Sequence, residues 1–241
     1  MKSFLMVGQS NMAGRGEFGE VPEIKNPHCF TLKNGLWEPM REPVNTDAPI
    51  FPDLQFGNII CGVGLAPAFA DLFANEYGED VGLIPCAHGG SYISQWLPGE
   101  VLYDNAVFHA KLAMRSSDLA GILWHQGEQD TDNECNASAH KERTGQVLRG
   151  LRMELGDVPI LVGGIGDFLG KLTPFVPTVN KGLEELCSEI PNCAFVSARG
   201  LSSKSDCVHF NSVSYREFGE RYFATYKKTV AMKEVKQNEI R

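Results

Sequence analysis

Short apolar runs recur along the chain and alternate with longer segments whose apolar residues follow a helical period. Runs rich in Val, Ile and Leu that are bounded by turn residues are typical of parallel strands buried on both faces. Five such runs predict strands at residues 4–7, 81–87, 121–125, 160–164 and 194–197. The other periodic segments predict helices at residues 65–76, 101–116, 137–155, 177–189 and 212–230.

This order of elements predicts an α/β fold. Because every strand but the last leads into a helix before the next strand, we expect a three-layer α/β/α sandwich with a five-stranded, mostly parallel sheet of the flavodoxin-like type. No internal repeat or low-complexity linker interrupts the chain, so residues 1–241 are expected to form a single domain. The Pro- and Gly-rich segment 14–62 is expected to be an irregular surface loop, and loops of that length are often functional.

Composition narrows the class of partner and the compartment. The formal net charge of -8 argues against nucleic acid, whose binding needs clustered Lys and Arg. Seven cysteines without a Cys-x-x-Cys pair predict reduced thiols in a cytoplasmic protein. The apolar start lacks a signal cleavage site, and no apolar stretch has the length of a membrane-spanning helix. We therefore expect a soluble protein with a neutral substrate and no membrane partner. The sequence leaves the oligomeric state open.

A serine follows the first predicted strand directly. The segment from Gly8 to Gly14 (GQSNMAG) places the Ser10 hydroxyl on a turn at the carboxyl edge of the sheet, among small residues. One interpretation is that Ser10 is a nucleophile. The other is that Ser10 and Asn11 only cap the turn that follows.

An aspartate and a histidine near the end of the chain have the spacing needed to activate that serine. Asp206 and His209 lie in the segment DCVHFN, after the last predicted strand and before the last helix. At this spacing the carboxylate can hold one imidazole nitrogen while the other nitrogen faces Ser10. The alternative is that Asp206 caps the final helix and His209 packs beside Phe210.

Two further strand ends carry groups that suit an oxyanion hole. Gln126 follows the third predicted strand, where its side-chain amide can donate to a tetrahedral intermediate. The turn after the second strand (AHGGS) offers the backbone N–H groups of adjacent glycines. Glu128 is expected to orient Gln126 or nearby main chain through hydrogen bonds. His125 is interpreted as a satisfied polar residue and Trp124 as core packing.

Taken together, these segments resemble a known family. The segments GQSNM at 8–12, GGS at 89–91, WHQGE at 124–128 with Asp130, and DCVH at 206–209 are similar to carbohydrate esterases of family 6, in the SGNH-hydrolase superfamily. That family includes acetylxylan esterases and sialate O-acetylesterase-like proteins. The resemblance spans nearly the whole chain and implies the fold expected above.

The resemblance also implies a role for each segment. The residues that it gathers into one site are the triad Ser10, Asp206 and His209, the oxyanion donors Ser10, Gly90 and Gln126, and the supporting Gln9, Asn11 and Glu128. The wider superfamily has Asn where this chain has Gln126. Gly89 and the glycines at 62 and 64 stay open as alternatives to Gly90. The implied reaction removes O-acetyl groups from a carbohydrate through an acetyl-enzyme, with no metal and no organic cofactor.

Two other functions stay open at the level of the sequence. A zinc-dependent hydrolase that uses His125, Glu128 and His209 is one, although no paired-ligand spacing supports it. A non-catalytic glycan-binding module of the same fold is the other. Among esterases, lipases and thioesterases use the same triad. We expect the loops at 45–53 and 89–98 to set the sugar preference, with Trp96 at the border of the pocket.

Overall fold

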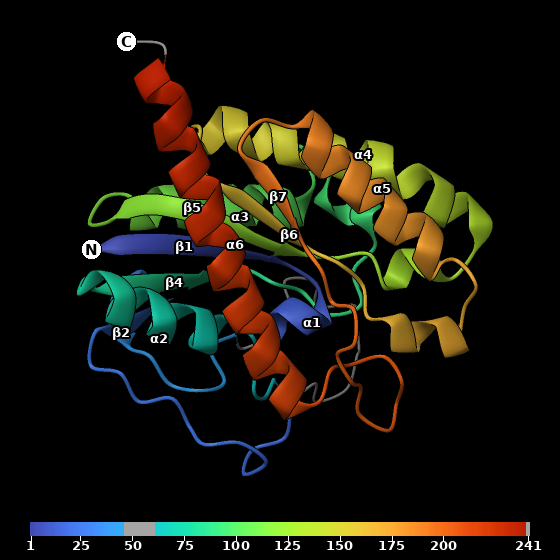
Figure 1. The fold of residues 1–241 in the computed structure, drawn as a ribbon, viewed down its shortest axis with the longest axis horizontal. Coiled ribbons are helices and arrows are strands. Elements are labelled where there is room, and N and C mark those ends of the chain that lie inside the picture. Colours follow the sequence, from blue (N-terminus) through green and yellow to red (C-terminus); the bar gives the residue numbers. More distant parts are fainter. Residues whose placement is uncertain (46–60, 240–241) are drawn as a thin grey trace.

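The computed structural model of the chain describes residues 1–45 and 61–239. Within these residues, the chain forms a sheet of seven strands in the order β3-β2-β4-β1-β5-β6-β7 (Figure 1). Every neighbouring pair is parallel except β2 and β3. The strands are β1 (Lys2–Gly8), β2 (Cys29–Lys33), β3 (Leu36–Pro39), β4 (Val81–Pro85), β5 (Asp118–His125), β6 (Ile160–Gly163) and β7 (Cys193–Val196). The predicted α/β fold with a mostly parallel sheet is confirmed.

Helices cover both faces of this sheet. Apolar residues of α2 and α6 pack on one face, and those of α3, α4 and α5 pack on the other. In Figure 1, α6 is drawn in red and crosses in front of the strands beside α2. The helices are α1 (Ser10–Ala13), α2 (Ala66–Tyr77), α3 (Val101–Ala113), α4 (Glu134–Leu155), α5 (Val176–Glu189) and α6 (Ser212–Glu239), with the 3₁₀ helices η1 (Ile93–Trp96), η2 (Gln129–Thr131) and η3 (Asp167–Lys171).

The predicted count of five strands is wrong, because β2 and β3 lie inside the segment expected to be an irregular loop. They form a hairpin at the edge of the sheet, with β2 parallel to β4. The turn between them is Asn34-Gly35, with φ angles of 50° and 80°. Asn-Gly is the pair that favours two-residue hairpin turns, so the sequence did carry a signal for this hairpin. β3 itself gave little signal, because it is mostly exposed and lacks a buried apolar face.

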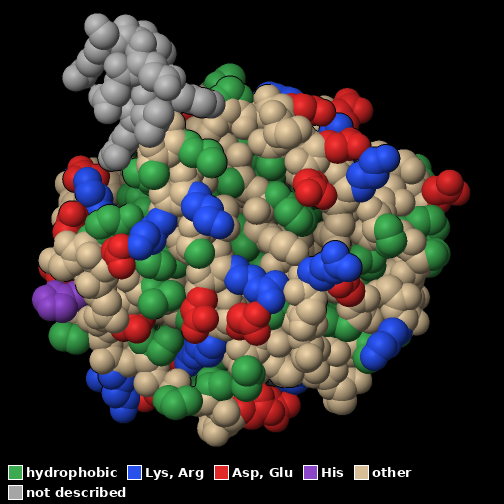
Figure 2. Space-filling view, in the orientation of Figure 1, with side chains coloured by type: hydrophobic (Ala, Val, Ile, Leu, Met, Phe, Trp, Pro, Cys, Tyr) green, Lys and Arg blue, Asp and Glu red, His purple; other side chains and the backbone are tan. Residues whose placement is uncertain are grey.

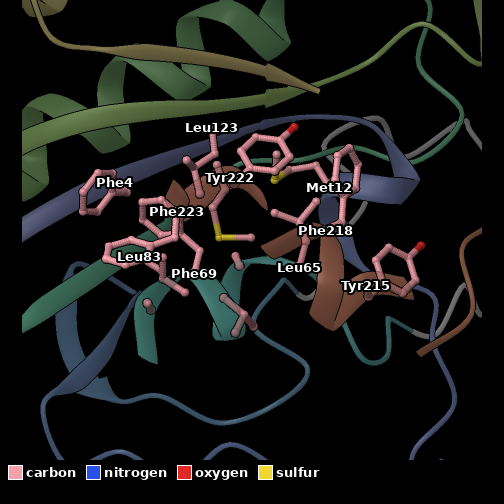
Figure 3. Packing of buried hydrophobic residues seen from close by; sticks show 14 of the residues in the cluster. Phe4, Met12, Leu65, Phe69, Leu83, Leu123, Tyr215, Phe218, Tyr222 and Phe223 are labelled. Carbon is pink, nitrogen blue, oxygen red and sulfur yellow. The ribbon is translucent and has the colours of Figure 1, made fainter. Parts of the chain in front are cut away.

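Alternate residues of the central strand β1 point into the two layers. Phe4 and Met6 pack with α2 and α6, whereas Leu5 and Val7 pack with the helices of the opposite face. This alternation follows from the two-residue period of a strand. Phe4 packs edge to face on Phe69, with 4.7 Å between ring centroids (Figure 3). Packing on both faces holds β1 in place and so positions the turn that follows it.

The surface over α2 and α6 carries acidic and basic side chains that are interspersed rather than segregated (Figure 2). In the part of the chain that the structure describes, no helix combines the length and the apolar character needed to cross a bilayer. Residues 46–53 of the loop expected to set sugar preference lie outside the described residues.

Candidate active site

The turn after β1 places Ser10 at the centre of the carboxyl edge of the sheet. Gly8, the last residue of β1, lies opposite His125 of β5. Its φ is +131°, and a Cβ at this position would lie 1.9 Å from the carbonyl oxygen of His125, so only glycine fits. The N–H of Gln9 donates to the same carbonyl at 2.9 Å. Ser10 then begins α1 and is 6% exposed.

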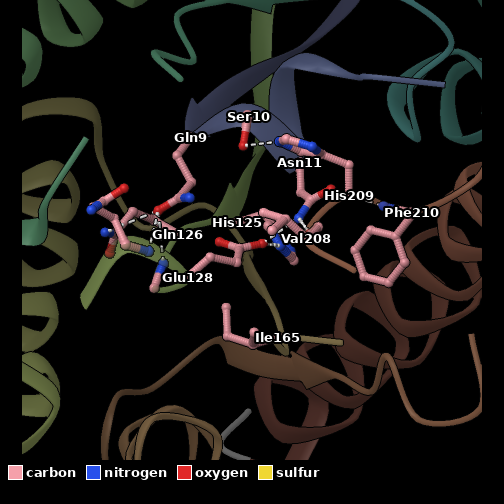
Figure 4. Close-up of polar contacts among 12 residues, drawn as sticks. Gln9, Ser10, Asn11, His125, Gln126, Glu128, Ile165, Val208, His209 and Phe210 are labelled. Atoms are coloured by element: carbon pink, nitrogen blue, oxygen red, sulfur yellow. Dashed lines mark hydrogen bonds and ion pairs between the residues drawn. The ribbon is translucent and has the colours of Figure 1, made fainter. Parts of the chain in front are cut away.

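The loop that precedes α6 brings His209 to this serine. Nε2 of His209 lies 3.0 Å from Ser10 Oγ (Figure 4). Its Nδ1 lies 2.8 Å from Asp206 Oδ2. The other carboxylate oxygen of Asp206 accepts the backbone N–H groups of Val208 and His209, both at 2.9 Å. The three side chains therefore form a hydrogen-bonded series, which is able to move a proton from a serine hydroxyl to an imidazole.

Asp206 is held as an ionised acceptor. Burial raises the pKa of Asp206, but the backbone N–H groups of His209 and Val208 and the His209 imidazole outweigh burial and hold that pKa below its usual value. Capping of α6 falls to Asn211, whose Oδ1 accepts the N–H of Ser214 at 2.8 Å. The carboxylate of Asp206 therefore orients His209, and the alternative of a helix cap is wrong.

Asn11 ties the nucleophile turn to the histidine loop. Its fully buried side chain donates from Nδ2 to the carbonyl of Val208 at 3.1 Å and accepts the N–H of Phe210 on Oδ1 at 3.2 Å. Both backbone groups belong to residues that flank His209. The hydroxyl of Tyr215 in α6 also donates to Oδ1, at 2.6 Å. One buried amide therefore fixes the backbone around His209 relative to the turn that carries the serine.

Glu128 supports Asn11. The sequence predicts that Glu128 orients Gln126 or nearby main chain, but Oε1 of Glu128 accepts from Asn11 Nδ2 at 2.6 Å and lies 2.6 Å from His125 Nε2. Burial raises the pKa of Glu128, but the charge and hydrogen bond of His125, together with the hydrogen bond from Asn11, bring that pKa below its usual value. An ionised Glu128 thus anchors the amide of Asn11.

Gln126 does not reach the oxyanion position. Its side chain is fully buried, and its Nε2 donates to Asp130 Oδ2 at 2.5 Å and to the carbonyl of Ser91 at 3.1 Å. Its Oε1 lies 2.9 Å from His140 Nε2. Because the amide hydrogens are used inside the protein, the prediction that Gln126 itself donates to an oxyanion is corrected.

Asp130 and His140 form a buried polar network with Gln126 that sequence reasoning missed. Asp130 Oδ2 also accepts the N–H of Ile93 at 2.9 Å, which fixes the start of η1 just beyond the glycine turn. Burial raises the pKa of Asp130 to about 6 and lowers the pKa of His140 to about 4. The four-residue spacing of Gln126 and Asp130 was a usable signal, whereas His140 lies on α4 and had none.

The glycine turn after β4 borders the same cleft as Ser10. Gly90 has a φ of +70°, and its N–H, like that of Ser10, donates to none of the described residues. Ser91 stabilises this turn, because its Oγ donates to the carbonyl of His88 at 2.8 Å. Two backbone donors are therefore available to a ligand beside the serine hydroxyl.

Trp96, which the sequence places at the border of the pocket, and His125, which it interprets as a satisfied polar residue and uses only in the zinc alternative, are both buried. Trp96 is 1% exposed and packs edge to face on Trp124, so it does not border the pocket. His125 is fully buried on Glu128, whereas His209 faces the serine. Over residues 1–45 and 61–239, no three His, Cys, Asp or Glu side chains are grouped as metal ligands.

A cleft of about 640 Å³ opens over Ser10 and His209. This volume is in the range of small-molecule sites, which is about 300–1,000 Å³. Polar and apolar side chains share its lining, which suits a ligand that carries both hydroxyl and methyl groups. They are the polar Gln129, Asp132 and Thr173 and the apolar Leu169, Leu172 and Val208.

Asn11→Asp is expected to destabilise the protein strongly, although the two side chains have nearly the same shape. It puts a second carboxylate where the amide nitrogen donates to Glu128 at 2.6 Å. Two buried carboxylates at this distance cannot both ionise, and breaking a buried charged contact costs about 3–5 kcal/mol. Urea unfolding of the purified variant measures the loss in free energy of unfolding.

Glu128→Gln provides the matched control for this prediction. In the double variant, the amide introduced at position 128 is able to donate to the carboxylate introduced at position 11. The two changes together should therefore cost at least about 1 kcal/mol less than the sum of the single changes. If the losses in free energy of unfolding simply add, the contact between Asn11 and Glu128 is not the cause of the destabilisation in Asn11→Asp.

Comparison with known proteins places the chain among carbohydrate esterases. Residues 1–228 match the model of a family described as carbohydrate esterase, sialic acid-specific acetylesterase. A probable carbohydrate esterase from Arabidopsis thaliana is 29% identical over 237 residues, which cover 90% of this chain and 86% of the relative.

Solved structures share the fold over almost the whole chain. The structure of the Arabidopsis thaliana protein has a TM-score of 0.82 at 26% identity and covers 94% of this chain and 98% of that one. NanS has a TM-score of 0.75 at 17% identity, over 96% of this chain and 97% of its own. A carbohydrate acetylesterase from Xanthomonas citri has a TM-score of 0.67 at 17% identity, over 94% of this chain and 56% of its own. At 17% identity, the last two show a common fold.

Proposed function

The chain belongs to the carbohydrate esterase family of sialic acid-specific acetylesterases, and from this premise we propose that it is a serine esterase of the SGNH type that removes O-acetyl groups from carbohydrates. The observation that carries the proposal is the hydrogen-bonded series of Ser10, His209 and Asp206. The cleft beside these residues and the backbone N–H groups of Ser10 and Gly90, which donate to none of the described residues, support it. Membership of carbohydrate esterase family 6 is part of the same proposal.

The first half of the proposed reaction transfers the acetyl group to the enzyme. Ser10 Oγ attacks the acetyl carbonyl carbon while Nε2 of His209 takes the hydroxyl proton. Asp206 stabilises the imidazolium, and the N–H groups of Ser10 and Gly90 receive the oxyanion. The imidazolium then gives its proton to the sugar oxygen, the bond between that oxygen and the acyl carbon breaks, and the sugar leaves.

The second half repeats these steps with water. His209 takes a proton from a water molecule, whose oxygen attacks the acetyl carbon on Ser10. The bond between Ser10 Oγ and the acetyl carbon then breaks, His209 returns that proton to Ser10 Oγ, and acetic acid leaves and ionises to acetate in solution. The same three side chains serve both halves, and neither half calls for a metal or an organic cofactor.

Activity is expected to fall as the acyl chain lengthens, by at least about tenfold in kcat/KM from acetyl to octanoyl esters. A long apolar channel would favour longer chains by about 0.8 kcal/mol for each buried methylene. Here the cleft is also lined by the polar side chains of Gln129, Asp132 and Thr173, so a longer acyl chain gains little burial. A series of p-nitrophenyl esters, together with acetate release from acetylated sugars, measures this preference.

Two outcomes would contradict different parts of the proposal. A rate that rises with chain length would keep the triad and overturn the assignment to carbohydrate acetyl groups. Loss of activity in EDTA that zinc restores, without inhibition by a serine-directed phosphonate, would overturn the serine mechanism itself.

A further inference from the structure

Two backbone N–H donors converge on one atom of the Gln9 side chain, and the amide nitrogen of Gln126 lies at the same distance from it. The backbone N–H groups of Gly127 and Gln129 and the Nε2 of Gln126 each lie 3.4 Å from Gln9 Oε1. The two backbone groups can only donate, so the atom that they share has to be the amide oxygen. Figure 4 shows this oxygen turned toward Gln126. The position of the amide nitrogen of Gln9 is thereby fixed as well.

The nitrogen of this amide is available to the cleft. Gln9 lines the cleft together with Ser10 and Gly90, and its Nε2 donates to none of the described residues. A ligand atom that binds in the cleft and accepts these hydrogens therefore gives the amide a partner that the protein does not supply. Gln9 directly precedes the nucleophile, so its side chain and the N–H of Ser10 come from the same turn.

We propose that Gln9, rather than Gln126, supplies the side-chain donor of the oxyanion hole. This inference rests on the serine-esterase function proposed above. When Ser10 attacks, the carbonyl oxygen of the ester gains a negative charge, and Gln9 Nε2 donates to it together with the N–H groups of Ser10 and Gly90. Gln9 keeps its own protons throughout, because an oxyanion hole binds charge without transferring hydrogen.

Gln126 is then a positioning residue. Its Nε2 contacts Gln9 Oε1 on one side and the carbonyl of Ser91, next to Gly90, on the other. Asp130 accepts from the same nitrogen and also holds Ile93 at the far end of the glycine turn. One buried amide thus links the side-chain donor to the backbone donor, which accounts for a fully buried glutamine at this strand end.

Gln9→Glu separates the two roles of this side chain. Glutamate has nearly the same shape, and its carboxylate is still able to accept from the backbone N–H groups of Gly127 and Gln129, but it has no hydrogen for an oxyanion. We expect kcat on a small acetyl ester to fall about 10²–10³-fold, with KM changed less than about threefold, because an oxyanion hole acts on the transition state. A purely structural role for Gln9 would leave Gln9→Glu nearly as active as the wild type.

Gln9→Ala and Gln129→Glu complete the set. Gln9→Ala should show a similar loss of kcat, and formamide added to the assay should restore part of it by occupying the vacated amide position. Gln129→Glu adds the same charge to the same cleft and measures the effect of charge alone, which we expect to stay below about tenfold. Binding of a small alkylboronic acid gives an independent readout, because the acid forms a tetrahedral adduct with the serine. Its Kd should rise in Gln9→Glu by the same factor by which kcat/KM falls.

The outcomes distinguish failure of this inference from failure of the proposed function. Wild-type activity that depends on Ser10, with less than tenfold loss in both Gln9 variants or a loss confined to KM, would overturn the assignment to Gln9. Wild-type activity that persists in Ser10→Ala would instead overturn the esterase mechanism on which the assignment rests.

Discussion

Ser10→Ala is expected to lower kcat/KM for a small acetyl ester by at least about 10⁴-fold. The hydroxyl oxygen that lies 3.0 Å from His209 Nε2 is removed, and α1 (SNMA) contains no second hydroxyl. Loss of a serine nucleophile costs about 10⁶-fold in a serine protease, where binding and the oxyanion donors maintain a residual rate. Substrate binding should change little, because the rest of the cleft is intact.

The fold should tolerate this change. Removing one hydroxyl is expected to lower the free energy of unfolding by about 1 kcal/mol at most, since a single hydrogen bond is worth about that much. Initial rates on an acetyl ester and the unfolding midpoint in urea separate loss of chemistry from loss of fold. Ser205→Ala is the matched control, because Ser205 is an exposed serine in the loop beside Asp206. Full activity in Ser10→Ala would mean that another group is the nucleophile.

The positions that the sequence placed well are those that follow buried strands. Ser10 and Gly90 follow neighbouring strands of a parallel sheet, whose carboxyl ends meet at one edge. Chain order and apolar pattern are therefore enough to bring them together. His209 follows a strand at the other end of the chain, and its spacing from Asp206 was the second usable signal, because a carboxylate three residues away can reach the imidazole.

The direction in which each side chain points at that edge could not be predicted. Gln9 and Gln126 are both glutamines at strand ends, and the sequence favours Gln126 as the oxyanion donor. The structure turns Gln126 inward because Asp130 and His140 take up its amide. His140 reaches that amide from α4, 14 residues along the chain, so its effect depends on how α4 packs rather than on any local pattern.

The missed hairpin has a different cause. β3 is an edge strand whose residues are mostly exposed, so burial imposes no alternation of apolar and polar residues on it. The turn at Asn34-Gly35 was the stronger signal, because both of its residues adopt positive φ angles that suit a tight hairpin. Turn chemistry is therefore a better guide than hydrophobic pattern at the edge of this sheet.

Asp206→Asn is expected to lower kcat by about 10⁴-fold while leaving the fold intact. The amide oxygen is still able to accept the N–H groups of Val208 and His209, which fixes how the new side chain must point. Its NH₂ group then faces His209 Nδ1, where the carboxylate now lies at 2.8 Å. The imidazole can satisfy that contact only by carrying its proton on Nε2, and in this tautomer it cannot accept the proton of Ser10.

Asp104→Asn is the control for loss of a negative charge, since Asp104 is exposed on α3. A loss of about 10⁴-fold corresponds to about 5.5 kcal/mol in the barrier, far more than the altered charge of an exposed residue supplies. Rates on an acetyl ester should fall in Asp206→Asn with the urea midpoint nearly unchanged, because the loop keeps its two backbone hydrogen bonds. A fall of less than about tenfold would mean that His209 finds its working tautomer without Asp206, and the pair of Ser10 and His209 would then act as a dyad.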